Sequence, residues 1–234
     1  MAEHPYEQPL FAGLYRQVRG SAQGLKPDIL GTLMERMFGA IDHTVDALKQ
    51  QDPPATPTAC QAECNYCCSV QVQLLPPEIL YIADHLKQFR TEAELQQLVD
   101  RVSIMEDQIS GLSAVDRARV GLPCPLLEND RCSVYDVRPI TCRAANSSDA
   151  ERCKAAIGPE AIQDTVPSYT HQVTVCRHVT RALLEGFQEI GFATPPLELV
   201  SALRIVLTND DAFSAWVRGE PVFAKAIAAD PPVA

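Results

Sequence analysis

Seven of the nine cysteines lie in two short groups, and this spacing constrains what the chain can fold into more than any other feature. The first group is Cys60-x3-Cys64-x2-Cys67-Cys68, and the second is Cys124-x7-Cys132-x9-Cys142. Cysteines grouped in this way either pair as disulfides or hold a metal. The rest of the sequence favours the metal.

Charge and terminal sequence indicate where the chain works. A net charge of -10 and a pI near 4.9 argue against binding of nucleic acid or an anionic membrane through a broad basic surface. The first residues lack the basic and apolar regions of a signal peptide, and no apolar run approaches the roughly 18 residues of a membrane span. We therefore expect a cytoplasmic protein, where clustered cysteines bind metal more often than they form disulfides. An odd number of cysteines also fits a disulfide framework poorly.

Apolar residues recur at helical spacing along much of the chain. Thr91 and Glu94 have the spacing of a capping box at the start of one helix. Proline-rich segments, above all residues 52–58, separate the helical patterns. We expect a short strand within residues 70–74, an irregular segment over residues 123–148, and helices over residues 27–50, 76–89, 91–111, 168–189, 195–207 and 211–218.

These patterns predict a mainly α fold, in which helices pack around an irregular, cysteine-rich metal-binding centre. We divide the chain into three parts. Residues 1–58 form an N-terminal helical extension with a proline-rich linker, and residues 59–155 form the cysteine-cluster domain. Residues 156–234 form a C-terminal helical region packed on the same core, with a frayed tail from about residue 228.

The first cysteine group has a spacing that would gather its sulfurs on one side of a helix. If residues 60–68 were α-helical, the four cysteines would fall within an arc of roughly 100°. Adjacent Cys67 and Cys68 fit one tetrahedral ion awkwardly, because neighbouring side chains diverge, and they suit a larger cluster or two sites better. The alternative, a buried stripe of small apolar side chains, fits poorly with the polar flanks Gln61, Glu63 and Asn65.

The second group contains the stretch Glu128-Asn-Asp-Arg131, whose composition is typical of a turn. A tight turn there would bring Cys124 and Cys132 together. Pro139 stiffens the approach to Cys142.

Taken together, the two groups resemble a known family. Cys-x3-Cys-x2-Cys-Cys, followed by Cys-Pro-x-Leu and Cys-x2-Tyr-x2-Arg-Pro-x2-Cys-Arg, is similar to the YkgJ-type cysteine cluster proteins of the CxxCxxCC family, over about residues 60–145. The resemblance implies a zinc- or iron-chelating domain with Tyr135, Arg138 and Pro139 as framework positions. A flagellin lysine methylase is related to the same pattern, which leaves an enzymatic role open. The chelating set that the resemblance implies is Cys60, Cys64, Cys67, Cys68, Cys124, Cys132 and Cys142.

Ligation by sulfur alone suits both iron–sulfur clusters and zinc. Seven thiolates are more than one 4Fe-4S cluster or one structural zinc requires, and with Cys153 there would be enough for two sites. This surplus, with the adjacent cysteines, makes an iron–sulfur cluster our first expectation and zinc the second. Cys176 lies on the apolar side of an expected helix, so we expect a buried thiol there.

A buried thiolate cluster is anionic and needs compensating charge or hydrogen-bond donors. Arg138 and Arg143 lie next to the second group, and we expect them to bind the cofactor's sulfurs or neighbouring carboxylates. The alternative is that both form ordinary surface ion pairs.

We therefore expect a cytoplasmic metal-binding protein whose partner is a metal ion or cluster, with no nucleic acid and no membrane. Two other classes stay open. One is a cluster-dependent, protein-modifying enzyme, methylase-like by analogy, and the other is a metal-handling or redox-sensing protein that docks on a protein partner. Catalytic residues are not indicated, because the sequence contains no phosphate-binding glycine loop, nucleophile elbow or dinucleotide fingerprint.

Overall fold

The computed structural model describes residues 4–61, 63–162 and 166–228, and it is mainly helical, as the sequence predicts. Its elements, in chain order, are α1 Glu7–Ser21, α2 Pro27–Gln51, η1 Tyr66–Ser69, β1 Gln73–Leu74, α3 Pro76–Phe89, α4 Glu92–Ile109, α5 Ala114–Val120, β2 Leu127–Glu128, β3 Arg131–Cys132, η2 Tyr135–Val137, α6 Ile140–Ala144, α7 Ala150–Ala155, α8 Thr170–Glu189, β4 Leu197–Glu198, α9 Leu199–Thr208, α10 Ala212–Val217 and η3 Ala224–Ala226.

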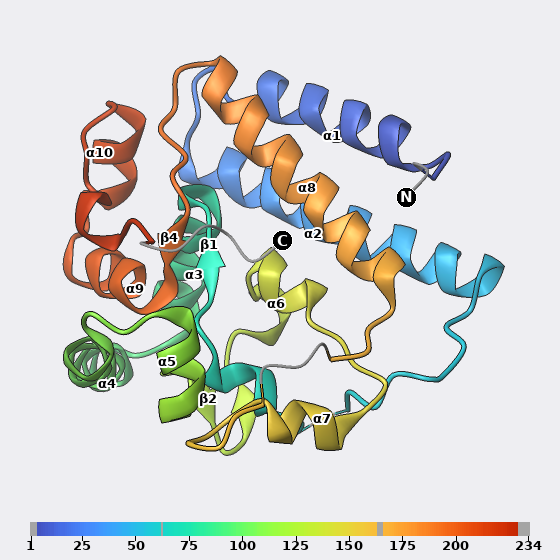
Figure 1. Cartoon of the computed structure of the whole chain (residues 1–234). Helices are drawn as coiled ribbons and strands as arrows, with labels where there is room; N and C mark the ends of the chain where they lie inside the picture. Colours follow the sequence, from blue (N-terminus) through green and yellow to red (C-terminus); the bar gives the residue numbers. More distant parts are fainter. Residues whose placement is uncertain (1–3, 62, 163–165, 229–234) are drawn as a thin grey trace.

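The long helices form two groups with the short elements between them. Helices α1, α2 and α8 lie side by side along the upper edge of Figure 1. Helices α4, α9 and α10 lie on the left of the same view, and α3 connects the two groups by packing against both α2 and α9. The cysteine-bearing elements η1, β3 and α6, with the neighbouring strand β2, occupy the centre and lower part of the view, so the long helices act as their scaffold.

The expected long helices form where their apolar patterns predict them. Helix α2 begins with proline at its first position, where a missing N–H costs nothing, and it buries a full apolar stripe. Helix α3 begins in the same way. The helix expected from residue 195 begins later, at Leu199, because Leu197–Glu198 pairs as a strand instead. The expected frayed tail lies mostly outside the described residues.

The described residues form two short antiparallel strand pairs. Strand β1 pairs with β4, with Gln73 opposite Glu198, and β2 pairs with β3. The strand expected within residues 70–74 is therefore present, and its partner comes from the C-terminal third of the chain. This pairing brings the segment that follows the first cysteine group next to the start of α9.

Helix α1 approaches α8 very closely. A Cβ atom added at Gly186 in α8 would lie 2.7 Å from Cγ1 of Val18 in α1, closer than real Cβ contacts allow. Val18 is fully buried. Glycine at position 186 therefore permits the two helix backbones to approach.

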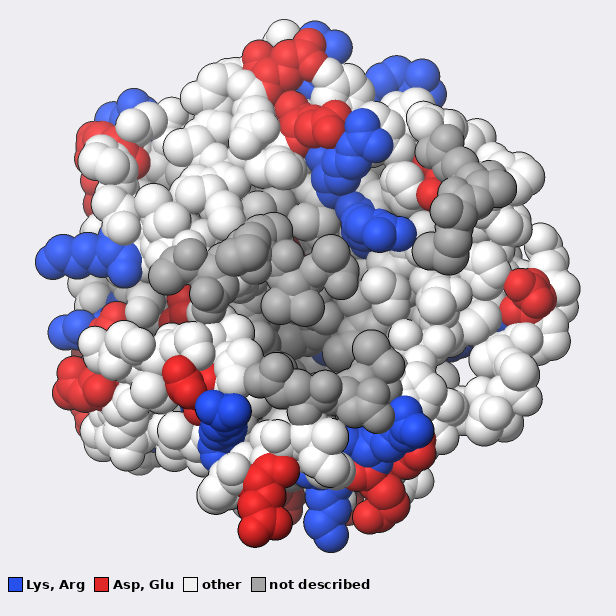
Figure 2. Space-filling view, in the orientation of Figure 1, with Lys and Arg blue, Asp and Glu red and all other residues white. Residues whose placement is uncertain are grey.

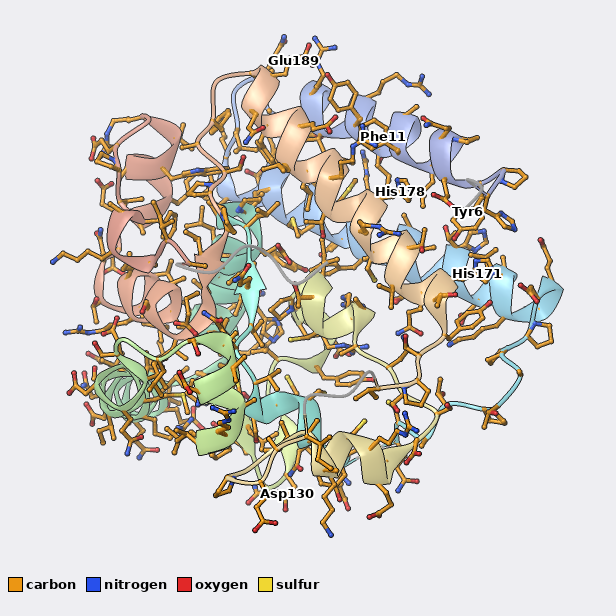
Figure 3. The ribbon with its side chains drawn as sticks, in the orientation of Figure 1. Tyr6, Phe11, Asp130, His171, His178 and Glu189 are labelled. Carbon is orange, nitrogen blue, oxygen red and sulfur yellow. The ribbon has the colours of Figure 1, made fainter. Side chains whose placement is uncertain are left out.

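A chain of polar contacts lies at the other end of these two helices. His178 in α8 pairs with Glu7 in α1, with Nε2 and Oε2 2.8 Å apart. The Tyr6 hydroxyl lies 3.2 Å from Nδ1 of His171, whose Nε2 is 2.9 Å from a carboxylate oxygen of Asp52. Figure 3 shows Tyr6, His171 and His178 along this side of the molecule. This network could not be predicted from the sequence, because its members are distant along the chain.

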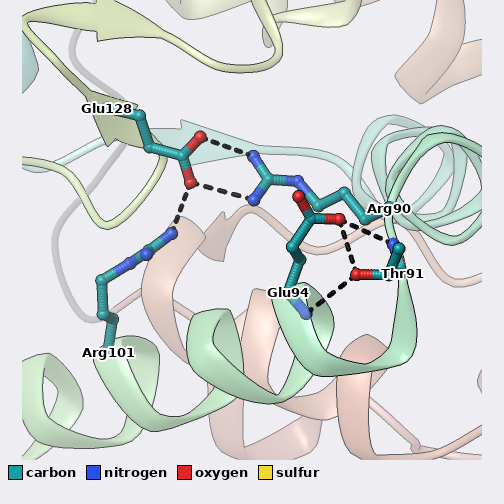
Figure 4. A network of polar contacts seen from close by, with 5 residues as sticks. All are labelled: Arg90, Thr91, Glu94, Arg101 and Glu128. Atoms are coloured by element: carbon teal, nitrogen blue, oxygen red, sulfur yellow. Dashed lines mark hydrogen bonds and ion pairs between the residues drawn. The ribbon is translucent and has the colours of Figure 1, made fainter.

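The start of α4 is tied to the β2–β3 hairpin (Figure 4). The two terminal guanidinium nitrogens of Arg90 donate to the carboxylate of Glu128, at 2.9 and 3.1 Å, and Arg101 donates to the same carboxylate at 2.7 Å. The expected capping box of Thr91 and Glu94 is present next to them. These contacts hold the hairpin that carries Cys132 against a long helix.

A single cluster of buried apolar side chains runs through α1, α2, α3, α4, α8 and α9. Among the described residues, no helix is both long and apolar enough to cross a bilayer. On the face shown in Figure 2, acidic and basic side chains stand in small mixed groups around the rim. The proposed division of the chain at residues 58 and 155 stays a prediction.

Candidate metal centre

The two cysteine groups fold onto each other. The backbone N–H of Cys124 donates to the carbonyl of Cys68 at 2.7 Å, which joins the end of the first group to the start of the second. Cys132 lies on β3 and Cys142 on α6. The described structure thus brings the segments of both groups to the middle of the molecule, and all nine cysteines are free thiols.

The backbone of the first group differs from the α-helix considered for residues 60–68. Two tight turns are closed by the N–H of Cys64 on Gln61 and by the N–H of Cys68 on Asn65, and only Tyr66–Ser69 is helical, as a 3-10 turn. The described residues of this segment therefore do not form the α-helix considered from the spacing, and the cysteines do not share one helix face. Residue 62 lies outside the described part.

Contacts with the hairpin explain why the first group does not form a helix. Glu63 has a positive φ of 71°, which an α-helix does not allow, and its carboxylate accepts from Arg131 at 2.7 Å. The amide of Asn65 donates to Asp130 at 2.8 Å. These tertiary contacts replace the local hydrogen bonds of a helix.

The turn expected at residues 128–131 is present and closes the β2–β3 hairpin. Asn129 and Asp130 have φ values of 50° and 61°, as both central residues of a type I′ turn require. Leu127 pairs with Cys132, and the N–H of Leu127 donates to the carbonyl of Cys124 at 2.9 Å. The hairpin therefore brings Cys124 and Cys132 together, with Asp130 at its tip (Figure 3).

Glu78 positions the helix that carries Cys142. Its carboxylate accepts from the N–H of Leu75 at 2.7 Å, which caps α3, and from the N–H of Ile140 at 2.8 Å, which begins α6. Burial raises the pKa of Glu78 to about 7. Thr141 adds a hydrogen bond from its hydroxyl to the carbonyl of Gln73 at 2.7 Å. Glu78 could not be recognised as a site residue from the sequence, since a glutamate near a helix start is common.

Burial keeps the thiols of Cys124, Cys132 and Cys142 protonated at neutral pH. It raises the pKa of Cys124 to about 12, raises that of Cys142 well above its ordinary value, and raises that of Cys132. Charge on the other cysteines raises these pKa values further, which shows that the thiols lie close enough to interact. Cys68 interacts in the same way with Cys124 and Cys142. A metal bound here must displace these protons.

Cys67 differs from its neighbours because it is exposed and has a lowered pKa. The thiol of Cys68 donates to Cys67, and this bond lowers the pKa of Cys67 to about 7 and raises that of Cys68. The positive charge of Arg138 contributes a smaller lowering. Cys67 is therefore a partly ionised thiol at neutral pH, the form that reacts and ligates metals.

The outer end of the centre contains Cys60 and Cys153. The N–H of Ser147 donates to Sγ of Cys60 at 3.3 Å, and Ser147 itself is buried. Burial raises the pKa of Cys60, and charge on Cys64, Cys67 and Cys153 adds to the effect. Helix α7, which carries Cys153, packs against η1. Cys153 thus lies beside the first group, whereas Cys176 is buried in the core with 1% exposure, as predicted.

The two candidate arginines have different surroundings. Arg143 is buried, pairs with Asp42 at 3.3 Å, donates to the carbonyl of Asp136 and stacks 4.1 Å above the ring of Phe38. These contacts join α6 to α2 and η2. Arg143 touches no cysteine sulfur through any of these contacts.

Arg138 lies nearer to the thiols. Its guanidinium stacks 3.7 Å from the ring centre of Tyr135 and donates to that residue's carbonyl at 3.0 Å. Its charge lowers the pKa of both Cys67 and Cys132. Tyr135 is 61% exposed and serves as the platform for this cation. The role of both arginines toward a cofactor stays a prediction.

Among the described residues, no three His, Cys, Asp or Glu side chains are already placed as ligands of one ion. The donor chemistry nevertheless fits a metal that prefers sulfur, since seven thiols and no carboxylate form the group. Cysteine side chains turn about their Cα–Cβ bonds between staggered positions, and this moves a sulfur without moving the backbone.

Comparison with protein families gives the class of this protein. Residues 59–179 match the family CxxCxxCC, described as a "putative zinc- or iron-chelating domain", and this match spans more than half of the chain. The chain belongs to this family. The match begins immediately before Cys60 and ends within α8, so it includes every cysteine of the chain. Neither the curated proteins nor the solved structures contain a match to this chain.

Proposed function

We propose that this chain is a cytoplasmic metal-binding protein that holds an iron–sulfur cluster or zinc through clustered cysteine thiolates. The observation that carries the proposal is the hydrogen bond of 2.7 Å between the backbones of Cys124 and Cys68, because it joins two cysteine groups that are far apart in the sequence. Membership of a family described as metal-chelating supports it. The nine free thiols suit a reducing compartment.

The electrostatic neighbours of each thiol give two overlapping sets of cysteines that share Cys67. The inner set shares mutual effects on pKa and contains Cys68, Cys124, Cys132 and Cys142. The outer set surrounds Cys60 and contains Cys64, Cys67 and Cys153. Cys67 also raises the pKa of Cys68, Cys132 and Cys142, so it lies between the two sets. We assign the metal to the inner set first, because a buried sulfur site excludes water and competing ligands. The outer set is then left for a second metal or for bridging through Cys67.

An iron–sulfur cluster, 4Fe-4S by ligand count, is our first choice of cofactor and zinc is the second. More thiols are present than one zinc takes. Arg138, whose charge already acts on Cys67 and Cys132, supplies positive charge beside an anionic cluster. When bound, such a cluster would provide electron transfer or a reactive iron. The residues described here would hold it, shield it from water and balance its charge.

Metal content of cysteine variants tests the proposal. We expect Cys142→Ala to lose most of the bound metal after anaerobic purification and dialysis, because it removes a buried inner ligand. Cys176→Ala is the matched control, a cysteine in the core of α8 outside both sets, and it should keep the metal content of the unaltered protein. Equal metal content in all three proteins would refute the assignment.

A second function, metal handling or redox sensing, is favoured by the state of one thiol. Cys67 is exposed with a pKa of about 7, and Cys60 is exposed beside it. Low pKa and exposure are the features of redox-sensing cysteines. Reversible loss of the metal on oxidation, with alkylation of Cys67 before the inner cysteines, would support this role. Simultaneous alkylation of all the thiols would argue against it.

A further inference from the structure

A cavity of about 430 Å³ adjoins the metal centre without forming part of it. Its walls come from β1 and the residues before it, from the start of α3, from α5, from the start of α6, from the segment that follows α7, from the middle of α8 and from the residue before β4. The lining is mostly apolar, with Val70, Leu74, Ala118, Ala156 and Pro196 among its members. A cavity of this size and character suits a small molecule.

Two of the lining residues connect the cavity to the cysteine segments. Val70 comes two residues after Cys68, and Thr141 immediately precedes Cys142. No cysteine belongs to the described lining. A ligand in this cavity would therefore lie next to the metal-binding segments, behind their backbone, and would not itself need to bind the metal.

The cavity wall includes two acceptor groups that form no hydrogen bond or ion pair with a described lysine or arginine side chain. The carboxylate of Glu78 is 1% exposed and accepts only two backbone N–H groups, and no described lysine or arginine forms an ion pair with it. The amide oxygen of Gln71 is buried and has no hydrogen-bond partner among the described residues. Both are acceptors, which favours a ligand rich in donors.

The only basic residue in the described lining, Arg119, does not supply a donor to the two acceptors. Arg119 is exposed, and its guanidinium lies 3.5 Å from a carboxylate oxygen of Asp116, one turn earlier on α5. Its charge is directed to a neighbouring carboxylate at the surface. The buried part of the wall thus carries an acidic group and no described basic one.

We propose that this cavity binds a small aliphatic primary amine, with the alkyl chain against α5 and the ammonium group bonded to Glu78 and Gln71. An ammonium carries three donors and no acceptor, so it can satisfy both oxygens. An alkyl chain matches the apolar walls. A fatty carboxylate would place a second negative charge beside Glu78, and an alcohol has one donor and no charge to offer. The inference concerns ligand binding alone and does not depend on which metal the protein holds.

Binding of three probes of equal chain length tests the chemistry. Hexylamine, hexanol and hexanoate are titrated into the full-length protein at pH 8 and followed by calorimetry. We expect hexylamine to bind at least about tenfold more tightly than hexanol, the factor that corresponds to about 1.4 kcal/mol, and hexanoate to bind more weakly than both. Equal affinity for the amine and the alcohol, or tighter binding of hexanoate, would overturn the proposal.

Two variants locate the binding in this cavity. Ala118→Phe fills the space from α5 and should weaken hexylamine binding at least about tenfold, whereas the control Val120→Phe, at a position of the same helix that is 50% exposed, should leave it unchanged. Gln71→Leu removes one acceptor with little change in shape, so it should weaken hexylamine more than hexanol. If Ala118→Phe keeps the affinity while its circular dichroism stays native, the amine binds elsewhere and the proposal is wrong.

Discussion

Glu78 is a buried acid whose titration should be visible in the stability of the whole protein. Its two carboxylate oxygens join the beginning of α3 to the beginning of α6, and its side chain is 1% exposed. Desolvation raises its pKa from 4.5 to about 7, although the two backbone N–H donors oppose the rise. We therefore predict that Glu78→Gln changes the pH dependence of folding.

The sign follows from proton binding. Between pH 4.5 and about 7, the folded protein holds a proton on Glu78 that the unfolded chain has lost, so the free energy of unfolding falls as pH rises. The energetic cost of ionising buried Glu78 is absent below the pKa of the unfolded chain and complete above the pKa of the folded protein. At about 1.4 kcal/mol for each pKa unit, the ionised carboxylate costs about 3 kcal/mol at high pH. Glutamine never ionises, so the free energy of unfolding of the variant, relative to that of the unaltered protein, should increase by roughly 2 to 3 kcal/mol between pH 5 and pH 8.

Urea unfolding of both proteins, measured anaerobically from pH 5 to pH 8, gives this difference directly, and titration of the cysteines cancels between them. Glu94→Gln is the matched control. Glu94 occupies the same position in the capping box of α4 but is exposed, and hydrogen bonds from the backbone and side chain of Thr91 lower its pKa. The contribution of Glu94 ionisation to stability is lost as the pH falls below its ordinary pKa of 4.5. The stability difference between Glu94→Gln and the unaltered protein should therefore be nearly constant from pH 5 to pH 8. A flat difference for Glu78→Gln would refute the reasoning.

Two further variants test the packing and the charge around the centre. Gly186→Ala should destabilise the protein by about 1 to 3 kcal/mol in urea unfolding, because the new methyl group overlaps Val18. Gly13→Ala, also within a helix but with nothing within 4 Å of the added Cβ atom, should be neutral or stabilising by up to about 1 kcal/mol. Equal effects of the two substitutions would contradict the close approach of α1 and α8. Arg138→Met should shift alkylation of Cys67 in the metal-free protein to higher pH, since it removes a positive charge that lowers the pKa of this thiol. An unchanged pH profile would show that this cation does not act on the thiol.

Long helices could be predicted from the sequence because their stability comes from one continuous apolar face. The residues of α2 that recur at helical spacing are the ones that the structure buries. The capping box of α4 and the turn before Arg131 could also be predicted, since both depend on residues close in sequence.

Segments fixed by distant contacts could not be predicted in the same way. The backbone conformation of the first cysteine group depends on contacts made by Glu63 and Asn65. Their partners, Arg131 and Asp130, are more than sixty residues away in the sequence. Helices α5, α6 and α7 are short, with five to seven residues each, and offer too few turns for a periodic pattern. The role of Glu78 depends on Ile140, and nothing local to either residue indicates their contact.

The most direct test of the central claim is metal and sulfide analysis of the anaerobically purified protein, together with its absorption spectrum. We predict a brown protein with broad absorbance near roughly 400 nm, where thiolate-ligated iron–sulfur clusters absorb, and with matching amounts of iron and acid-labile sulfide. A colourless protein with stoichiometric zinc would keep the metal centre and reject the cluster. A protein that contains neither iron nor zinc, and takes up neither when reconstituted, would contradict the claim that these cysteines hold a metal.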